Sequence, residues 1–148
     1  MKASEHFSVQ EFVSPEIFNA QGINPIWFVS KQQIKAAEFL KDYFSTIAGK
    51  EVFITINNWH KGGPLKNRGT RAPWTETGGK LSQHKFMNGF DFNVSGMTSD
   101  EVYDHIMASQ APFLAAGITT IEDKSMTQGW THIDFRITGM DHLFVVKP

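Results

Sequence analysis

The chain of 148 residues suits one domain, residues 1–148, and it carries 14 Lys and Arg against 15 Asp and Glu. This balance argues against nucleic-acid binding, and no apolar run reaches the roughly 18 residues that a membrane span needs, so we expect no membrane insertion. No cysteine is present, which excludes disulfides and thiolate ligands and leaves six histidines and the carboxylates as candidate metal ligands.

The first part of the chain predicts short turns, one long helix and one strand. We expect helical turns over residues 7–18. A long helix is predicted over residues 30–48, because Ser30 and Gln33 form a capping box, apolar side chains recur at helical spacing and a glycine follows. The β-branched residues of the stretch 52–56 predict a strand.

The stretch 57–81 is rich in Gly and Pro and shows no periodicity. It also holds Trp59, Trp74, Arg68 and Arg71. A long irregular loop within a compact domain is usually either functional or disordered, and the aromatic side chains argue against disorder. We therefore expect this loop to line a functional site.

The second part of the chain predicts strands around one helix. Alternation over residues 90–94 puts Asp91 and Asn93 on one face of a strand. A capping box of Thr98 and Glu101 begins a helix that runs to about residue 110. A further turn and three closing strands are expected at residues 112–116, 118–122, 130–137 and 143–146. The pattern predicts an α+β fold with a mainly antiparallel sheet and flanking helices.

Asp91 follows His84 by seven positions. On a helix this spacing separates the two by about 10 Å along the axis, too far to share one zinc ion. A hairpin turning at Met87 and Asn88 would instead set them opposite one another, with Cβ atoms roughly 5 Å apart. The Asn88-Gly89 pair also suits a turn but shifts the register by two, so the pairing stays open.

The stretch 130–136 supplies the third candidate ligand. As a strand it aims Trp130, His132, Asp134 and Arg136 at one face. Two histidines and one carboxylate leave a fourth position free for water, as catalytic zinc sites require. We therefore predict that His84, Asp91 and His132 bind Zn²⁺, which would acidify that water and polarise a scissile carbonyl.

Catalysis also needs a general base. We predict Glu122, because a hairpin through the loop after it would bring it near His132. Asp134 is the alternative base, and it could equally orient a metal-bound imidazole. Arg71 or Arg68 could hold a substrate carboxylate or the carbonyl oxygen through the planar guanidinium.

These residues resemble a known family. The Ser82-x-His84 segment, Asp91 and the run Trp130-Thr131-His132-Ile133-Asp134 are similar to the zinc D-Ala-D-Ala carboxypeptidases and L-alanyl-D-glutamate endopeptidases. The resemblance implies the hedgehog/DD-peptidase fold, one catalytic zinc and hydrolysis of peptidoglycan stem peptides, as in phage endolysins. His84, Asp91 and His132 would be the ligands, an acid near His132 the base and an upstream Arg a substrate contact. We also expect Ser82 and Trp130 to bind substrate.

The chain departs from the family pattern in several places, one of which is the run Asn58-Trp59-His60-Lys61, where the family has a Ser-Gly-Tyr-like turn before its arginine. Met87 stands where the family usually has Gly, and Gly89 where it has Ala. Gly129 occupies the position, three residues before the last His, where many members place the catalytic acid. This last departure motivates an alternative function, a cell-wall-binding or structural module of a phage particle that does not cleave.

The N-terminal residues lack the apolar stretch of a secretion signal. We expect synthesis in the bacterial cytoplasm and action on the cell wall after phage lysis or as part of a virion. The expected partner is a peptidoglycan peptide, and the expected state is a monomer.

Overall fold

A five-stranded mixed sheet forms the centre of the computed structural model, which describes residues 1–148. Its strands are β1 (Ile54–Thr55), β2 (Gly89–Val94), β3 (Thr120–Glu122), β4 (Thr131–Asp134) and β5 (Phe144–Val146), in the order β1-β2-β4-β3-β5. Three pairings are antiparallel, whereas β5 runs parallel to β3. The α+β class is therefore confirmed, and the sheet is mixed rather than purely antiparallel.

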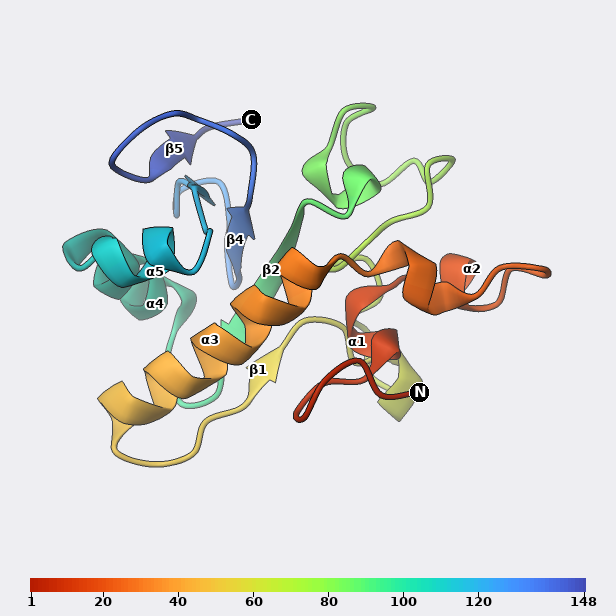
Figure 1. Ribbon diagram of the computed structural model, residues 1–148, viewed down its shortest axis with the longest axis horizontal. Helices are drawn as coiled ribbons and strands as arrows, with labels where there is room; N and C mark the ends of the chain where they lie inside the picture. Colours follow the sequence, from red (N-terminus) through yellow and green to blue (C-terminus); the bar gives the residue numbers. More distant parts are fainter.

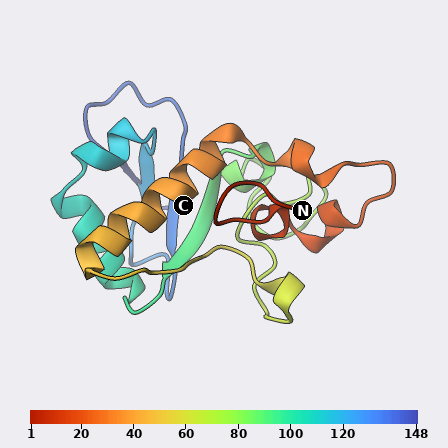
Figure 2. The ribbon, with the colours of Figure 1, turned by 60° about the horizontal axis from the view of Figure 1, so that its bottom comes forward.

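The long helix α3 (Lys31–Ala48) lies diagonally across the sheet in both ribbon views (Figures 1 and 2). Its predicted capping box is confirmed, since the Gln33 backbone N–H donates to Ser30 Oγ and the Gln33 side chain accepts from the Ser30 N–H. Gly49 ends the helix with a left-handed φ of 64°. Leu40 and Phe44 face the sheet and are fully buried.

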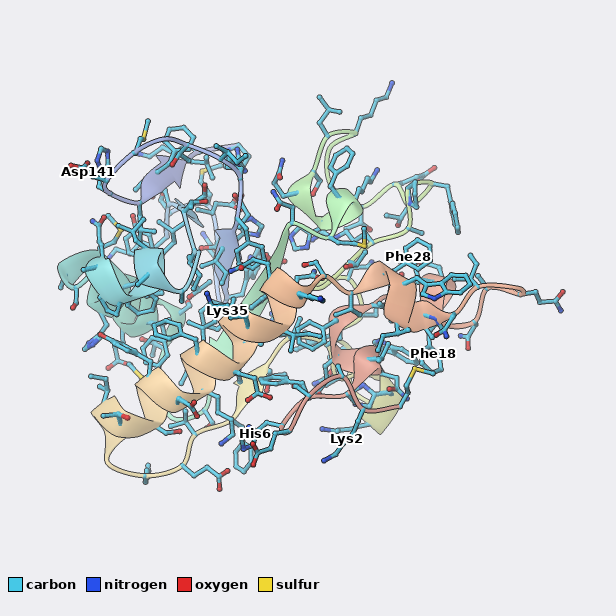
Figure 3. All side chains as sticks on the ribbon, viewed as in Figure 1. Lys2, His6, Phe18, Phe28, Lys35 and Asp141 are labelled. Carbon is cyan, nitrogen blue, oxygen red and sulfur yellow. The ribbon has the colours of Figure 1, made fainter.

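The main core lies between the sheet, α3 and the two helices α4 (Ser99–Ala108) and α5 (Ala111–Ala115). The N-terminal region holds α1 (Val9–Phe12), α2 (Pro15–Phe18) and the 3₁₀ helix η1 (Pro25–Phe28). Three of its residues and Ala72 of the loop 57–81 form a smaller core of four buried residues. Phe18 and Phe28, labelled in Figure 3, pack against this second core. No helix combines the length and the apolar character that a membrane crossing demands.

The predicted loop 57–81 contains no strand or α-helix, and its one regular turn is the 3₁₀ helix η2 (Trp59–Lys61). Gln33 ties this loop to the sheet. Its buried amide donates to Thr70 Oγ1 and to the carbonyl oxygen of Gly89, both at 3.2 Å. One residue therefore caps α3 and fixes the loop against the beginning of β2.

The backbone of β2 approaches β4 closely at Gly89. A Cβ atom at this position would lie 2.6 Å from the carbonyl oxygen of Ile133 and 2.7 Å from Asp134 Cβ. Gly79 has no heavy atom within 4 Å of such a Cβ. The two glycines thus form a matched pair for a test of packing.

We expect Gly89→Ala to lower the free energy of unfolding by about 1–3 kcal/mol, the usual cost of overpacking. Gly79→Ala should stay within about 0.5 kcal/mol of wild type. Urea denaturation followed by circular dichroism measures both. Equal stability of Gly89→Ala and wild type would show that β2 and β4 are not packed as described.

Candidate metal centre

His84 reaches the site from a 3₁₀ helix. It lies in η3 (Gln83–Phe86), which ends at Met87 with a left-handed φ of 55° before β2 begins. The predicted hairpin between His84 and Asp91 is therefore wrong, because β2 pairs with β1 and β4 and not with residues 83–86. The helical turn and the Met87 reversal bring the two side chains together instead.

Asp91 and His132 face each other across the sheet. They are direct partners in the antiparallel register of β2 and β4. His132 Nδ1 lies 2.7 Å from Asp91 Oδ1, and His84 Nε2 lies 3.2 Å from the same oxygen. All three side chains are buried.

These three residues can hold a metal ion. Each offers one ligand atom, and the atoms lie within 4.8 Å of one another. Metal bonds of about 2 Å require donors within about 4 Å of each other, and both separations from Asp91 already meet that condition. The predicted convergence of His84, Asp91 and His132 is therefore confirmed as a possible metal-binding group.

Each imidazole is oriented by a second partner. His84 Nδ1 lies 2.9 Å from the Gly69 carbonyl oxygen, so Nδ1–H donates there and leaves the Nε2 lone pair for a metal. His132 Nε2 lies 3.4 Å from Asp134 Oδ2, which leaves Nδ1 on the Asp91 side. Backbone and carboxylate acceptors thus select the ring nitrogens that face the common centre.

The charges of Asp91 and the two histidines influence one another. His84 and His132 hold the pKa of Asp91 well below its usual range, against the opposing effect of burial. Burial also disfavours the charged form of His132, but hydrogen bonds to Asp134 and Asp91 prevail and raise its pKa to about 9. Without a metal, His132 is therefore protonated at neutral pH.

A cavity of about 700 Å³ opens beside the three ligands. Its lining includes the predicted residues Glu122, Arg71, Ser82 and Trp130. It also includes residues that we did not predict for the site, at positions 78, 79, 81 and 83, at Arg136 and along β5 to Pro148. Strand alternation had placed Arg136 on the face of His132, and this signal would have identified it.

Glu122 and Asp134, the two candidate bases, differ in location. Glu122 is the last residue of β3 and lines the cavity. The charges of His132, Asp91 and Arg71 act on its pKa. Burial raises its pKa above the ordinary value. Asp134 is fully buried and does not line the cavity, so it cannot reach a substrate-side water. Of the two candidate bases, Glu122 is therefore the one that faces the cavity, whereas Asp134 contacts His132.

The two candidate arginines also differ. Arg71 lines the cavity, and its Nη2 lies 3.4 Å from Asp91 Oδ2 while its Nε–H donates to the Asn67 carbonyl at 2.6 Å. Arg68 does not line the cavity. It donates to Asn93 Oδ1, and its guanidinium lies 5.8 Å from the centre of a Trp130 ring. Arg71 is therefore placed to contact a molecule bound in the cavity, whereas Arg68 packs against the ring of Trp130.

Removal of one ligand should abolish metal binding. We expect wild type to bind about one divalent ion and His84→Ala to bind none, because two remaining ligands hold an ion far more weakly than three. His142→Ala, which removes an exposed imidazole elsewhere, should keep the full stoichiometry. Metal analysis by mass spectrometry after dialysis gives the count. Equal loading of wild type and His84→Ala would contradict the site.

Metal binding should also release a proton. A ligand imidazole must be neutral, whereas His132 has a pKa of about 9 in the metal-free protein. The affinity should therefore rise about tenfold per pH unit from pH 7 and level off near pH 9. Calorimetry of Zn²⁺ binding in buffers of different ionisation enthalpy counts the protons. An affinity that does not change between pH 7 and 8 would contradict the protonated state of His132.

Comparisons with known proteins do not assign a function to this site. No family model, no curated protein and no solved structure matches the chain. What the site can do therefore follows from its own residues and distances.

Proposed function

We propose that the protein is a zinc-dependent peptidase that hydrolyses an amide bond in peptidoglycan stem peptides. One observation carries the proposal. The buried group of His84, Asp91 and His132 opens onto a cavity that also presents Glu122 and Arg71. A three-ligand centre beside a carboxylate and a guanidinium is the set of groups that metal-assisted amide hydrolysis uses.

The donor set fits zinc. Two imidazoles and one carboxylate match the ligands of catalytic zinc sites that keep one position open. The same donors also occur in non-haem iron oxygenases. The carboxylate of Glu122 on the cavity wall favours hydrolysis, because proton transfer to and from water needs such a group. Metal identity is thus part of the proposal.

The residues of the chain divide the chemical work. His84, Asp91 and His132 would hold the ion, which would supply Lewis acidity to a water molecule and to the scissile carbonyl. Glu122 would accept the proton of the attacking water and deliver it to the leaving amine, a role that its raised pKa suits. Arg71 would stabilise the negative charge that develops on the carbonyl oxygen.

The choice of peptidoglycan as the proposed substrate rests on the sequence resemblance. The segment from Ser82 to Asp91 and the run from Trp130 to Asp134 supply the ligands of the site, and the zinc carboxypeptidase and endopeptidase pattern implies these same ligands. We accordingly propose the hedgehog/DD-peptidase fold, a monomer and a phage endolysin-like role. Glu122 would replace the acid that many members carry at the position of Gly129.

Replacement of the proposed base separates catalysis from metal binding. Glu122→Gln should keep one bound zinc and lower the rate of peptide cleavage by about 10²–10⁴-fold. Asp123→Asn, which alters the adjacent acid outside the cavity, should leave the rate within a few-fold of wild type. The assay counts new amino and carboxyl termini in purified peptidoglycan by mass spectrometry.

Each result decides between the two candidate functions. Cleavage by zinc-loaded wild type that is lost in Glu122→Gln supports the peptidase. Undiminished cleavage by Glu122→Gln contradicts the role of Glu122. If zinc-loaded wild type binds peptidoglycan but releases no new termini, the protein is a wall-binding module and not an enzyme.

Replacement of Asp134 tests the orienting role. We expect Asp134→Asn to weaken zinc binding by about 10–100-fold, the usual effect of losing an outer acceptor of a ligand histidine. Cleavage at saturating zinc should fall less than in Glu122→Gln. Competition with a chromogenic chelator measures the affinity, and unchanged zinc affinity in Asp134→Asn would contradict this assignment.

A further inference from the structure

Arg136 lines the cavity but has no part in the proposed hydrolysis. The cavity lining contains three cationic side chains, Arg71, Arg136 and Lys147, against the carboxylates of Asp91 and Glu122. Asp91 is committed to the ligand group and Glu122 to proton transfer. Arg71 is paired with Asp91, and Lys147 lies 3.4 Å from Asp123 Oδ2. Arg136 is paired with Asp134, so its capacity to bind an anionic part of a ligand depends on the N–H donors that this pair leaves free.

The guanidinium of Arg136 is held by hydrogen bonds to Asp134. Its Nε–H donates to Asp134 Oδ1 at 2.9 Å and its Nη2 to Asp134 Oδ2 at 2.5 Å. Asp134 is completely buried, whereas the Arg136 side chain is 35% exposed. A buried carboxylate holds a paired guanidinium firmly, because separation would leave an uncompensated charge in the interior.

The outer part of the guanidinium remains free. Arginine carries five N–H donors. The contacts with Asp134 use the Nε–H and one N–H of Nη2, so three donors have no acceptor in the protein. A fixed guanidinium with free donors on a cavity wall is preorganised to bind a carboxylate through parallel hydrogen bonds.

The position of Arg136 relates it to the metal ligands. Its Nη2 lies 2.5 Å from Asp134 Oδ2, and that oxygen lies 3.4 Å from His132 Nε2. The guanidinium is thus within about 6 Å of the His132 ring. Arg71 contacts Asp91, and Arg136 contacts the acceptor of His132. A ligand carboxylate on Arg136 would belong to a residue close to the bond at the metal centre.

We propose that Arg136 is a specificity-determining residue that binds a carboxylate of the substrate peptide, so that the protein selects acidic peptides. This inference rests on the proposed function for the peptide nature of the substrate. The carboxylate has two possible sources, the C-terminus of the peptide or an acidic residue within it. The first source corresponds to a carboxypeptidase and the second to an endopeptidase.

Binding of matched peptides tests the inference without turnover. The protein is zinc-loaded Glu122→Gln, and the probes are two pairs of synthetic stem peptides. One pair differs only by a C-terminal carboxylate or carboxamide, and the other only by a free or amidated α-carboxyl on an internal D-glutamate. We expect the carboxylate form of one pair to bind at least about tenfold more tightly, as charge-assisted pairing with arginine implies.

Substitution of Arg136 completes the test. Arg136→Gln, made in the same background, should reduce the preference for the carboxylate to less than about twofold and leave affinity for the carboxamide peptide nearly unchanged. Arg136→Lys keeps a cation beside Asp134 but loses the planar guanidinium, so it should retain zinc and show an intermediate preference. Lys147→Gln, which neutralises another cation of the same wall, should keep most of the preference.

The outcomes are separate from those of the proposed function. Wild type that cleaves peptides but does not discriminate carboxylate from carboxamide overturns the role of Arg136 and leaves the peptidase intact. A preference that persists in Arg136→Gln, equal losses for both members of a pair, or no binding of any probe at millimolar concentration also overturns it. An Arg136-dependent preference in a protein that cleaves nothing supports it.

Discussion

The arrangement of the candidate site depends on one buried carboxylate. Asp91 sits on β2, opposite His132 on β4, and only 6% of its surface is exposed, so contact with water contributes little to stabilising its charge. A buried ionised carboxylate is tolerated only with close partners. His84, His132 and Arg71 supply them from a 3₁₀ helix, a neighbouring strand and a long loop. Segments distant in sequence are therefore joined at a single side chain, and a divalent cation there would replace the proton that His132 carries in the metal-free protein.

Successive contacts around the ligands keep this arrangement rigid. The Gly69 carbonyl oxygen fixes one imidazole, and Asp134 fixes the other. Gln33 holds the loop that contains Gly69, because its amide bonds both Thr70 and the first residue of β2. The capping residue of the longest helix thus contributes to the geometry of the site. Arg136 has two roles in this arrangement. It pairs with the charge of Asp134, and it presents its unused N–H donors to the cavity.

Local patterns predicted much of the fold and the three residues of the candidate metal-binding group, but not how these residues meet. Capping signals placed α3 and α4 within two residues of their observed bounds, because these signals depend only on neighbours in sequence. The hairpin between His84 and Asp91 was wrong because a seven-residue spacing can be closed in more than one way. Met87 adopts a left-handed conformation that its residue type does not predict, because residues other than Gly rarely adopt it. The parallel pairing of β5 with β3 and the burial of Asp134 depend on contacts between distant segments, which no local pattern encodes.

The most direct test of the account is an anomalous difference map at the zinc absorption edge, from crystals grown with zinc. The account predicts a single strong peak that lies about 2.0–2.2 Å from His84 Nε2, Asp91 Oδ1 and His132 Nδ1, with a fourth position facing the cavity. A map without a peak at these atoms, in which the two imidazoles still donate hydrogen bonds to Asp91, would contradict it.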